Sequence, residues 1–262
     1  MYGGTARSGA SGNTGATSNQ GGFAAGADAE YRPGLRLGFA IGSGYSHVGA
    51  RGTGGIADDI GLHVGPYASF RTGQWFANAQ MFGTFHDVTT RRDTGFGRTR
   101  SSARGFGGSG GFEAGRSLDV AGIGVEPLVG FRVDHLRTDG VTETGSDLAL
   151  AVKQGSATSA RSSMGARVSS DVTLGTQVIN LSLKAVWAHE FSQTTTLTEA
   201  RFAQGSDSFR VISARTGRDA AIVNAYVGAN LAPAVAVYAR AGMEVRGNYS
   251  AMSGSAGLRL GF

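Results

Sequence analysis

Cysteine is absent from the 262 residues, which excludes disulfides, thiolate metal sites and a thiol nucleophile. Proline is scarce, with 4 residues, and charged residues make up 16%, against about 25% in ordinary soluble domains. No apolar run approaches the roughly 18 to 20 residues that a membrane-spanning helix needs. The sequence therefore predicts neither a disulfide scaffold nor a membrane helix, and its polarity comes from Gly, Ser, Thr and Asn.

A secretory signal is also missing from the start of the sequence. Met1-Tyr2-Gly3-Gly4 lacks a basic region followed by an apolar run. If the protein is exported, we expect its precursor to begin upstream. Residues 1–262 would then be one domain of a longer chain, with its N-terminal edge truncated.

Glycine is the abundant residue, with 44 copies, and 40% of the chain is hydrophobic, too much for a disordered protein. The formal net charge is +5, carried by arginine, because Lys153 and Lys184 are the only lysines. The arginines are scattered, whereas a nucleic-acid interface clusters them on one face. We therefore expect no nucleic-acid partner.

Apolar and polar residues alternate with a period of two along most of the chain, which is the period of a β-strand. At the C-terminus one face carries Met252, Gly254, Ala256, Leu258, Leu260 and Phe262. The other face carries Ser253, Ser255, Gly257, Arg259 and Gly261. Similar alternation occurs in residues 23–31, 35–45, 125–136, 179–191 and 235–246.

Alternation alone also fits a soluble β-sandwich. Three features favour a membrane barrel. The predicted strands of about 10 to 14 residues are longer than the usual 5 or 6. Glycine and charge crowd the polar face in mid-strand, and aromatic residues sit near strand ends on the apolar face. We predict an all-β fold, a closed antiparallel transmembrane β-barrel of about 12 strands.

The predicted strands begin near Tyr2, Phe23, Leu35, Ile60, Trp75, Ala103, Gly124, Ala157, Val178, Ala220, Val235 and Ser250. Short turns are expected at 32–34, 72–74, 174–176 and 232–233. Long loops are expected at 8–20, 48–58, 89–101, 138–156 and 192–217. In bacterial barrels the short turns are periplasmic and the long loops extracellular.

The strand period also predicts which charged side chains line the lumen. These are Asp28, Glu30, Arg36, Glu113, Glu126, Arg132, Asp134, Lys184, Glu190, Arg240, Glu244, Arg246 and Arg259. A charge facing lipid at mid-membrane would cost roughly 2 to 4 kcal/mol, so an inward orientation is favoured. Opposite charges could brace the wall by pairing across strands. Alternatively, some could contact a segment inside the lumen or line an ion path.

Motifs that would carry catalytic chemistry are weak in this sequence. Gly105-Phe106-Gly107-Gly108-Ser109-Gly110 matches GxGxxG, but a strand-like pattern follows it instead of a helix. His47, His63, His86, His135 and His189 show no metal-ligand spacing. No Gly-x-Ser-x-Gly elbow lies between a strand and a helix. We therefore predict no catalytic residues, no cofactor and no metal.

Several motifs, in this order, resemble those of the autotransporter (type V secretion) C-terminal translocator domain. They are 21–28, 37–46, 125–130, 185–191, 217–220, 247–250 and the terminal Ala256-Gly257-Leu258-Arg259-Leu260-Gly261-Phe262. The resemblance implies an outer-membrane barrel of a Gram-negative bacterium that enables export of an N-terminal passenger. It implies a linker helix through the pore, and barrel insertion machinery that reads Leu258, Leu260 and Phe262 as an assembly signal.

Two functions of different classes stay open at this point. The first is the translocator barrel, a monomer in outer-membrane lipid that is covalently linked to its passenger. The second is a free-standing pore or structural surface protein of the same architecture. A passenger and a signal peptide encoded in frame upstream would distinguish them.

Overall fold

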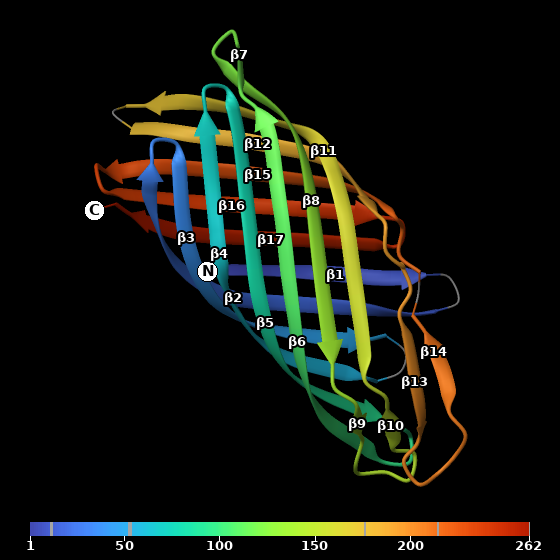
Figure 1. The fold of residues 1–262 in the computed structure, drawn as a ribbon. Helices are drawn as coiled ribbons and strands as arrows, with labels where there is room; N and C mark the ends of the chain where they lie inside the picture. Colours follow the sequence, from blue (N-terminus) through green and yellow to red (C-terminus); the bar gives the residue numbers. More distant parts are fainter. Residues whose placement is uncertain (11–12, 52–53, 176, 214, 262) are drawn as a thin grey trace.

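A computed structural model describes residues 1–10, 13–51, 54–175, 177–213 and 215–261, and every regular element in these ranges is a strand (Figure 1). The long strands are β1 (Tyr2–Ala10), β2 (Asn13–Arg32), β3 (Leu35–Ala50), β4 (Ile56–Thr72), β5 (Trp75–Asp93), β6 (Arg98–Arg116), β8 (Ile123–Thr138), β11 (Gly155–Leu174), β12 (Gln177–Glu190), β15 (Asp219–Ala232), β16 (Val235–Arg246) and β17 (Tyr249–Leu260). The short strands are β7 (Leu118–Val120), β9 (Val141–Thr142), β10 (Leu150–Val152), β13 (Leu197–Phe202) and β14 (Phe209–Ile212). Among these described residues, no helix is long and apolar enough to cross a membrane.

The long strands close into one antiparallel barrel. The first strand pairs with the last, with Thr5 opposite Met252, and β8 pairs with β11, with Phe131 opposite Ser162. The Met1 ammonium group also donates to the Ala256 carbonyl at 2.9 Å. Each strand of the barrel wall thus has a neighbour on both sides. The predicted closed barrel of twelve strands is confirmed for the described part of the chain.

One end of the barrel carries tight turns and both chain ends, which makes it the periplasmic end. At the β2–β3 turn, Gly34 has a φ of 78°. Its N–H donates to the Glu30 carboxylate at 3.0 Å and its carbonyl accepts from the Arg71 N–H at 2.7 Å. A Cβ at this position would lie 2.1 Å from the Arg71 carbonyl oxygen, so only glycine fits the turn.

The hairpins at the opposite end extend further than the sequence predicts. The expected loops at 8–20, 48–58 and 89–101 are wrong, because most of these residues continue β1 to β6. The second strand begins at Asn13, ten residues before the expected start at Phe23. These ends lack an apolar face, so alternation could not reveal them. Hydroxyl pairs, such as Ser18 with Ser46 at 3.3 Å, join the polar strand ends.

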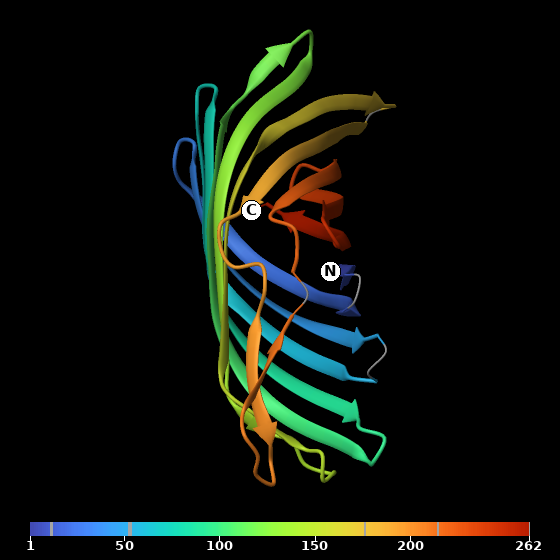
Figure 2. The same cartoon turned by 90° about the vertical axis from the view of Figure 1, so that its right-hand side faces the viewer.

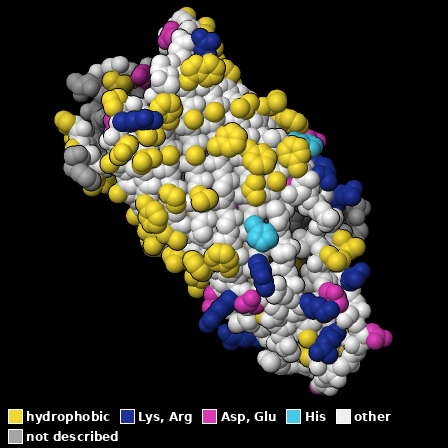
Figure 3. All heavy atoms as spheres, viewed as in Figure 1, with side chains coloured by type: hydrophobic (Ala, Val, Ile, Leu, Met, Phe, Trp, Pro, Cys, Tyr) yellow, Lys and Arg dark blue, Asp and Glu magenta, His cyan; other side chains and the backbone are white. Residues whose placement is uncertain are grey.

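The outer surface of the barrel is apolar. Phe39 is 55% exposed and Leu258 is 58% exposed, and both point away from the interior. Figure 3 shows hydrophobic side chains spread over the barrel wall, with charged side chains toward its two ends and most of them at the lower end of the view. This distribution is what a lipid-facing band with a polar extracellular end requires.

The two longest connections form a second sheet at the extracellular end, in the order β14-β13-β10-β9. Figure 2 shows this sheet at the end of the barrel opposite the β7–β8 hairpin. The Lys153 N–H donates to the Glu199 carbonyl at 3.0 Å, which joins the two connections. Arg92 on β5 forms an ion pair of 2.6 Å with Glu143, which fastens the sheet to the barrel wall. The connections at 138–156 and 192–217, expected as loops, therefore contain the four short strands of this sheet.

Glu143 gives the attachment of this sheet a pH dependence. Burial raises the pKa of its carboxyl, but hydrogen bonds from Arg92 and from the Leu150 N–H outweigh burial and lower the pKa below its usual value. A lowered folded-state pKa means that the ionised form stabilises the sheet above the unfolded pKa. This contribution is lost as the pH falls through the folded value.

We therefore expect the amide protection factors of Leu150 and Val152 to fall between neutral pH and acidic pH. Glu143→Gln should show reduced protection already at neutral pH, because it removes the charge that pairs with Arg92. Hydrogen exchange measured on the barrel in lipid checks this. Glu199→Gln is the control, since Glu199 pairs with Lys153 at the surface. Protection in Glu143→Gln equal to that of the unmodified chain at neutral pH would disprove the attachment.

Candidate functional site

The barrel interior is crossed by polar contacts between strands that are not neighbours in the wall. Such contacts can only form on the concave face. Asp28 on β2 is the centre of one cluster near the periplasmic end. Its carboxylate accepts from Arg36 at 2.6 Å, from the Tyr67 hydroxyl at 2.9 Å and from Arg259 at 3.2 Å. The cluster links β2 with β3, β4 and β17.

A larger ionic cluster lies between β4, β6, β8, β11 and β12. Arg167 donates to Glu126 at 2.6 Å and to Glu113 at 2.7 Å. Lys184 donates to the second Glu113 oxygen at 2.6 Å. Glu126 is buried and also forms an ion pair with Arg71 at 3.3 Å. Two carboxylates and three cations thus share one connected network inside the barrel.

An aromatic ring and a few aliphatic side chains pack beside this network. The guanidinium carbons of Arg71 and Arg167 lie 5.6 and 5.7 Å from the centroid of the Phe76 ring. Phe76 is 4% exposed and packs with Leu128 and Val186. Cations over an aromatic face are attracted by its quadrupole. The lumen at this level is therefore narrowed by packed side chains.

A third cluster lies nearer the extracellular end. Arg161 on β11 forms an ion pair with Glu244 on β16 at 3.1 Å, which spans two intervening strands. Glu244 also contacts Arg246 at 3.2 Å. Glu190 joins this cluster through an ion pair of 3.9 Å with Arg161. It is 4% exposed and accepts hydrogen bonds from the backbone N–H groups of Ala160 and Ser192, both at 2.9 Å.

The remaining predicted lumen residues make local contacts. Arg132 and Asp134 pair along β8 through a bidentate contact of 2.6 and 2.7 Å. Arg240 lies over the rings of Tyr226 and Tyr238, 5.6 and 5.2 Å from their centroids. Glu30 accepts from the Gly34 turn. Within the described part of the chain, no hydrogen bond or ion pair joins these residues to the three clusters, although Glu30 lies opposite Arg36 on the neighbouring strand.

Sequence reasoning missed several members of the clusters, namely Arg71, Arg161, Arg167, Tyr67 and Phe76. The sequence of β11 offers little apolar contrast, because Ser and Ala occupy both faces. The available signal was that Arg161 and Arg167 share a parity opposite to that of Met164 and Val168. The GxGxxG motif lies within β6 as part of the wall.

The structure describes the C-terminal residues as far as Gly261. Leu258 pairs with Val237 and Leu260 with Val235, and both leucines are exposed on the outer surface. Phe262 lies outside the described residues. His189 also lies on the outer surface, with ring contacts of 5.8 Å to Trp187 and 5.0 Å to Phe191.

Fold and lumen together define an outer-membrane β-barrel with a charged interior. The family model for the autotransporter beta-domain matches residues 1–242, and the chain belongs to this family. It is located in the Gram-negative outer membrane, where such barrels support passenger export. Three solved translocator structures share the fold. The translocator domain of NalP from Neisseria meningitidis is 15% identical with a TM-score of 0.79, and the match covers all of this chain and 86% of that chain. The β-domain of BrkA from Bordetella is 18% identical with a TM-score of 0.68, and the match covers all of this chain and 98% of that chain. The transport unit of AIDA-I from Escherichia coli is 16% identical with a TM-score of 0.65, and the match covers all of this chain and 88% of that chain.

A curated relative extends this comparison. An extracellular serine protease of Serratia marcescens is 27% identical over 261 residues. The match covers 97% of this chain but 25% of the relative, so the chain spans about a quarter of the relative's length.

The ionic cluster around Arg167 predicts a stability effect. Arg167→Met leaves the buried Glu126 and the partly exposed Glu113 each without one cation, and we expect it to destabilise the barrel by about 3 kcal/mol, chiefly through Glu126. Arg132→Met removes a pair whose side chains are 48% and 34% exposed, and should cost less than about 1 kcal/mol. Urea unfolding in lipid vesicles compares the two. Equal midpoints for the two variants would show that the cluster does not brace the wall.

Proposed function

We propose that the lumen is the path by which a covalently linked N-terminal passenger leaves the cell, and that a linker segment occupies the lumen afterwards. The observation that carries this proposal is the set of ion pairs across the interior. Side chains that pair with one another across the lumen can also pair with a polypeptide inside it. The predicted lumen residues, from Asp28 to Arg259, would make these contacts.

The position of the N-terminus supports the same path. Met1 lies at the periplasmic end of the wall, where its ammonium group contacts the Ala256 carbonyl. A segment joined ahead of Met1 therefore starts beside the periplasmic opening. We propose that residues 1–262 form a single translocator domain that works as a monomer. The chemistry of the exported protein would reside in the passenger, and the barrel itself would carry out no chemical step.

A crosslinking experiment tests passage through the lumen. A reporter passenger with a single cysteine in its linker is joined ahead of Met1, behind a secretory signal. Glu244→Cys places the barrel cysteine on the inner face, whereas Met243→Cys places the neighbouring residue on the outer face. We expect Glu244→Cys to crosslink to the linker in cells that display the reporter. Met243→Cys should not crosslink. Crosslinking at Met243→Cys alone would place the passenger outside the barrel.

The insertion machinery is a proposed partner, recognised through the C-terminal residues. The alternating series Leu258, Leu260 and Phe262 ends in an aromatic side chain, which membrane interfaces favour. We expect deletion of Phe262, or Phe262→Asp, to lower the amount of barrel in outer-membrane fractions far more than Gly261→Asp does.

A second measurement separates recognition from simple anchoring. Exposure of a phenylalanine side chain to lipid contributes about 1.5 to 3 kcal/mol through burial alone. If Phe262 only anchors the strand, its deletion lowers the melting temperature of the inserted barrel but leaves membrane levels normal. That result would refute recognition by the insertion machinery.

A further inference from the structure

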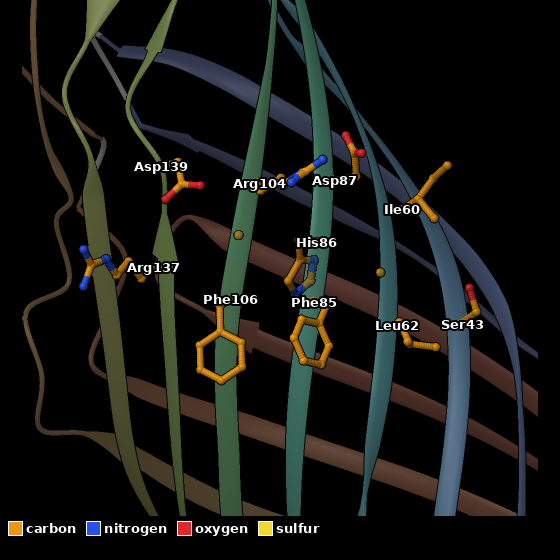
Figure 4. A pocket seen from close by; sticks show the side chains of 12 residues that line it. Ser43, Ile60, Leu62, Phe85, His86, Asp87, Arg104, Phe106, Arg137 and Asp139 are labelled. Atoms are coloured by element: carbon orange, nitrogen blue, oxygen red, sulfur yellow. The ribbon is translucent and has the colours of Figure 1, made fainter.

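A groove crosses the outer wall of the barrel over β4, β5, β6 and the end of β8, with a volume of about 630 Å³. This lies within the roughly 300 to 1,000 Å³ of small-molecule sites. Figure 4 shows the Phe85 and Phe106 rings side by side, with Leu62 on the neighbouring strand. The two ring centroids are 5.3 Å apart, and all three side chains are between 43% and 58% exposed. The middle of the groove is therefore an open apolar surface.

Charged side chains line the extracellular end of the groove. Asp87 and Arg104 lie opposite each other on β5 and β6, and Arg137 lies opposite Phe106. Asp139 is placed beside Arg104 by a backbone hydrogen bond of 2.9 Å to the Arg104 carbonyl. Arg137 donates only to the neutral side chain of Gln154, at 2.9 Å, and no ion pair of Arg104 occurs within the described ranges. Both guanidinium groups are thus available to an anion.

The charged end coincides with the edge of the lipid-facing band. Between Arg104 and Arg116, the outward residues of β6 are Phe106, Gly108, Gly110, Phe112 and Ala114, and none is charged. Twelve residues along a strand tilted at about 40° cross roughly 30 Å, the thickness of a bilayer core. Arg116 lies at the periplasmic boundary and Arg104 at the extracellular boundary. The groove therefore meets lipid at its apolar end and headgroups at its charged end.

Below the two phenyl rings, the outer wall has a furrow without side chains. Gly83 and Gly108 are directly paired, and Gly110 follows on β6. A Cβ added at any of the three would come no closer than 3.8 Å to another atom, so the space outside them is open. Packing does not demand glycine at these positions. The furrow continues from the aromatic rings into the lipid-facing band, in the direction an acyl chain would take.

We propose that this groove binds a phosphorylated glycolipid of the outer leaflet. Figure 4 shows the Arg104 side chain extending toward Asp87 and the Arg137 side chain extending away from it, so each arginine would hold a separate phosphate group, because arginine matches phosphate oxygens in charge and geometry. Asp87 and Asp139 would accept hydrogen bonds from sugar hydroxyl groups. An acyl chain would pack on Phe85 and Phe106 and continue along the glycine furrow. The carboxylates beside the arginines favour a ligand that brings hydroxyl donors, and the two separate arginines favour a ligand with two phosphate groups, whereas phosphatidylglycerol has one.

Native mass spectrometry of the detergent-purified barrel tests the proposal with three lipids: bisphosphorylated lipid A, the same lipid after dephosphorylation, and phosphatidylglycerol. We expect one lipid A to bind. The Arg104→Gln and Arg137→Gln double variant should weaken binding about ten-fold or more, as should loss of the phosphates. Gly108→Leu should also weaken binding, because it fills the furrow. Heat-modifiable migration on gels shows that each variant is folded.

The matched control is Arg116→Gln. Arg116 also points outward beside an aromatic ring, 5.8 Å from the Trp75 centroid, but at the periplasmic boundary. Lipid A binding should be unchanged in this variant. Equal affinity in the double variant and the unmodified chain, or equal affinity for the dephosphorylated lipid, would overturn the proposal. Phosphatidylglycerol binding as tightly as lipid A would assign the groove to anionic lipids in general and would also overturn it.

Discussion

Every backbone amide within the lipid-facing band needs a partner from another strand, because hydrocarbon offers neither a donor nor an acceptor. The pairing of β1 with β17 and of β8 with β11 meets this requirement by closing the sheet on itself. Closure also creates an interior, and the period of two along each strand sends every second side chain into it. The low charge of the outer face and the polar lumen both follow from this one constraint.

Closure of the barrel leaves a lumen, and ion pairs between side chains of different strands cross it. A barrel that passes a polypeptide through its lumen, as we propose, cannot be filled with a permanent apolar core. The pair between Arg167 and Glu113 keeps 26% and 20% side-chain exposure, and that between Arg161 and Glu244 keeps 23% and 20%. Partly hydrated ion pairs lose little when one partner is exchanged for another charge. The same contacts can thus brace an empty barrel and, under the proposed function, be exchanged for contacts with a linker segment.

The sequence predicted the features that depend on alternation between lipid and lumen, and it missed those that do not. Strand starts at Leu35, Trp75 and Val235 were correct to the residue. The start of β2 was misplaced because residues beyond the membrane face water on both sides, which removes the apolar signal. Arg167 was missed because serine and alanine occupy both faces of β11, which leaves little apolar contrast along that strand. The partners of Glu113 could not be inferred at all, since contact across the lumen depends on the curvature of the wall rather than on local pattern.

The length of the hairpins ties the membrane-spanning and extracellular parts together. A membrane strand needs about 9 to 11 residues, whereas β5 and β6 each have 19. The outer face of this hairpin therefore meets two environments, and it changes from phenylalanine to charge between Phe106 and Arg104. Beyond that boundary the same strands carry Arg92, which holds the second sheet through Glu143. A shorter hairpin would close the barrel equally well, but it would leave the two long connections without a rigid support.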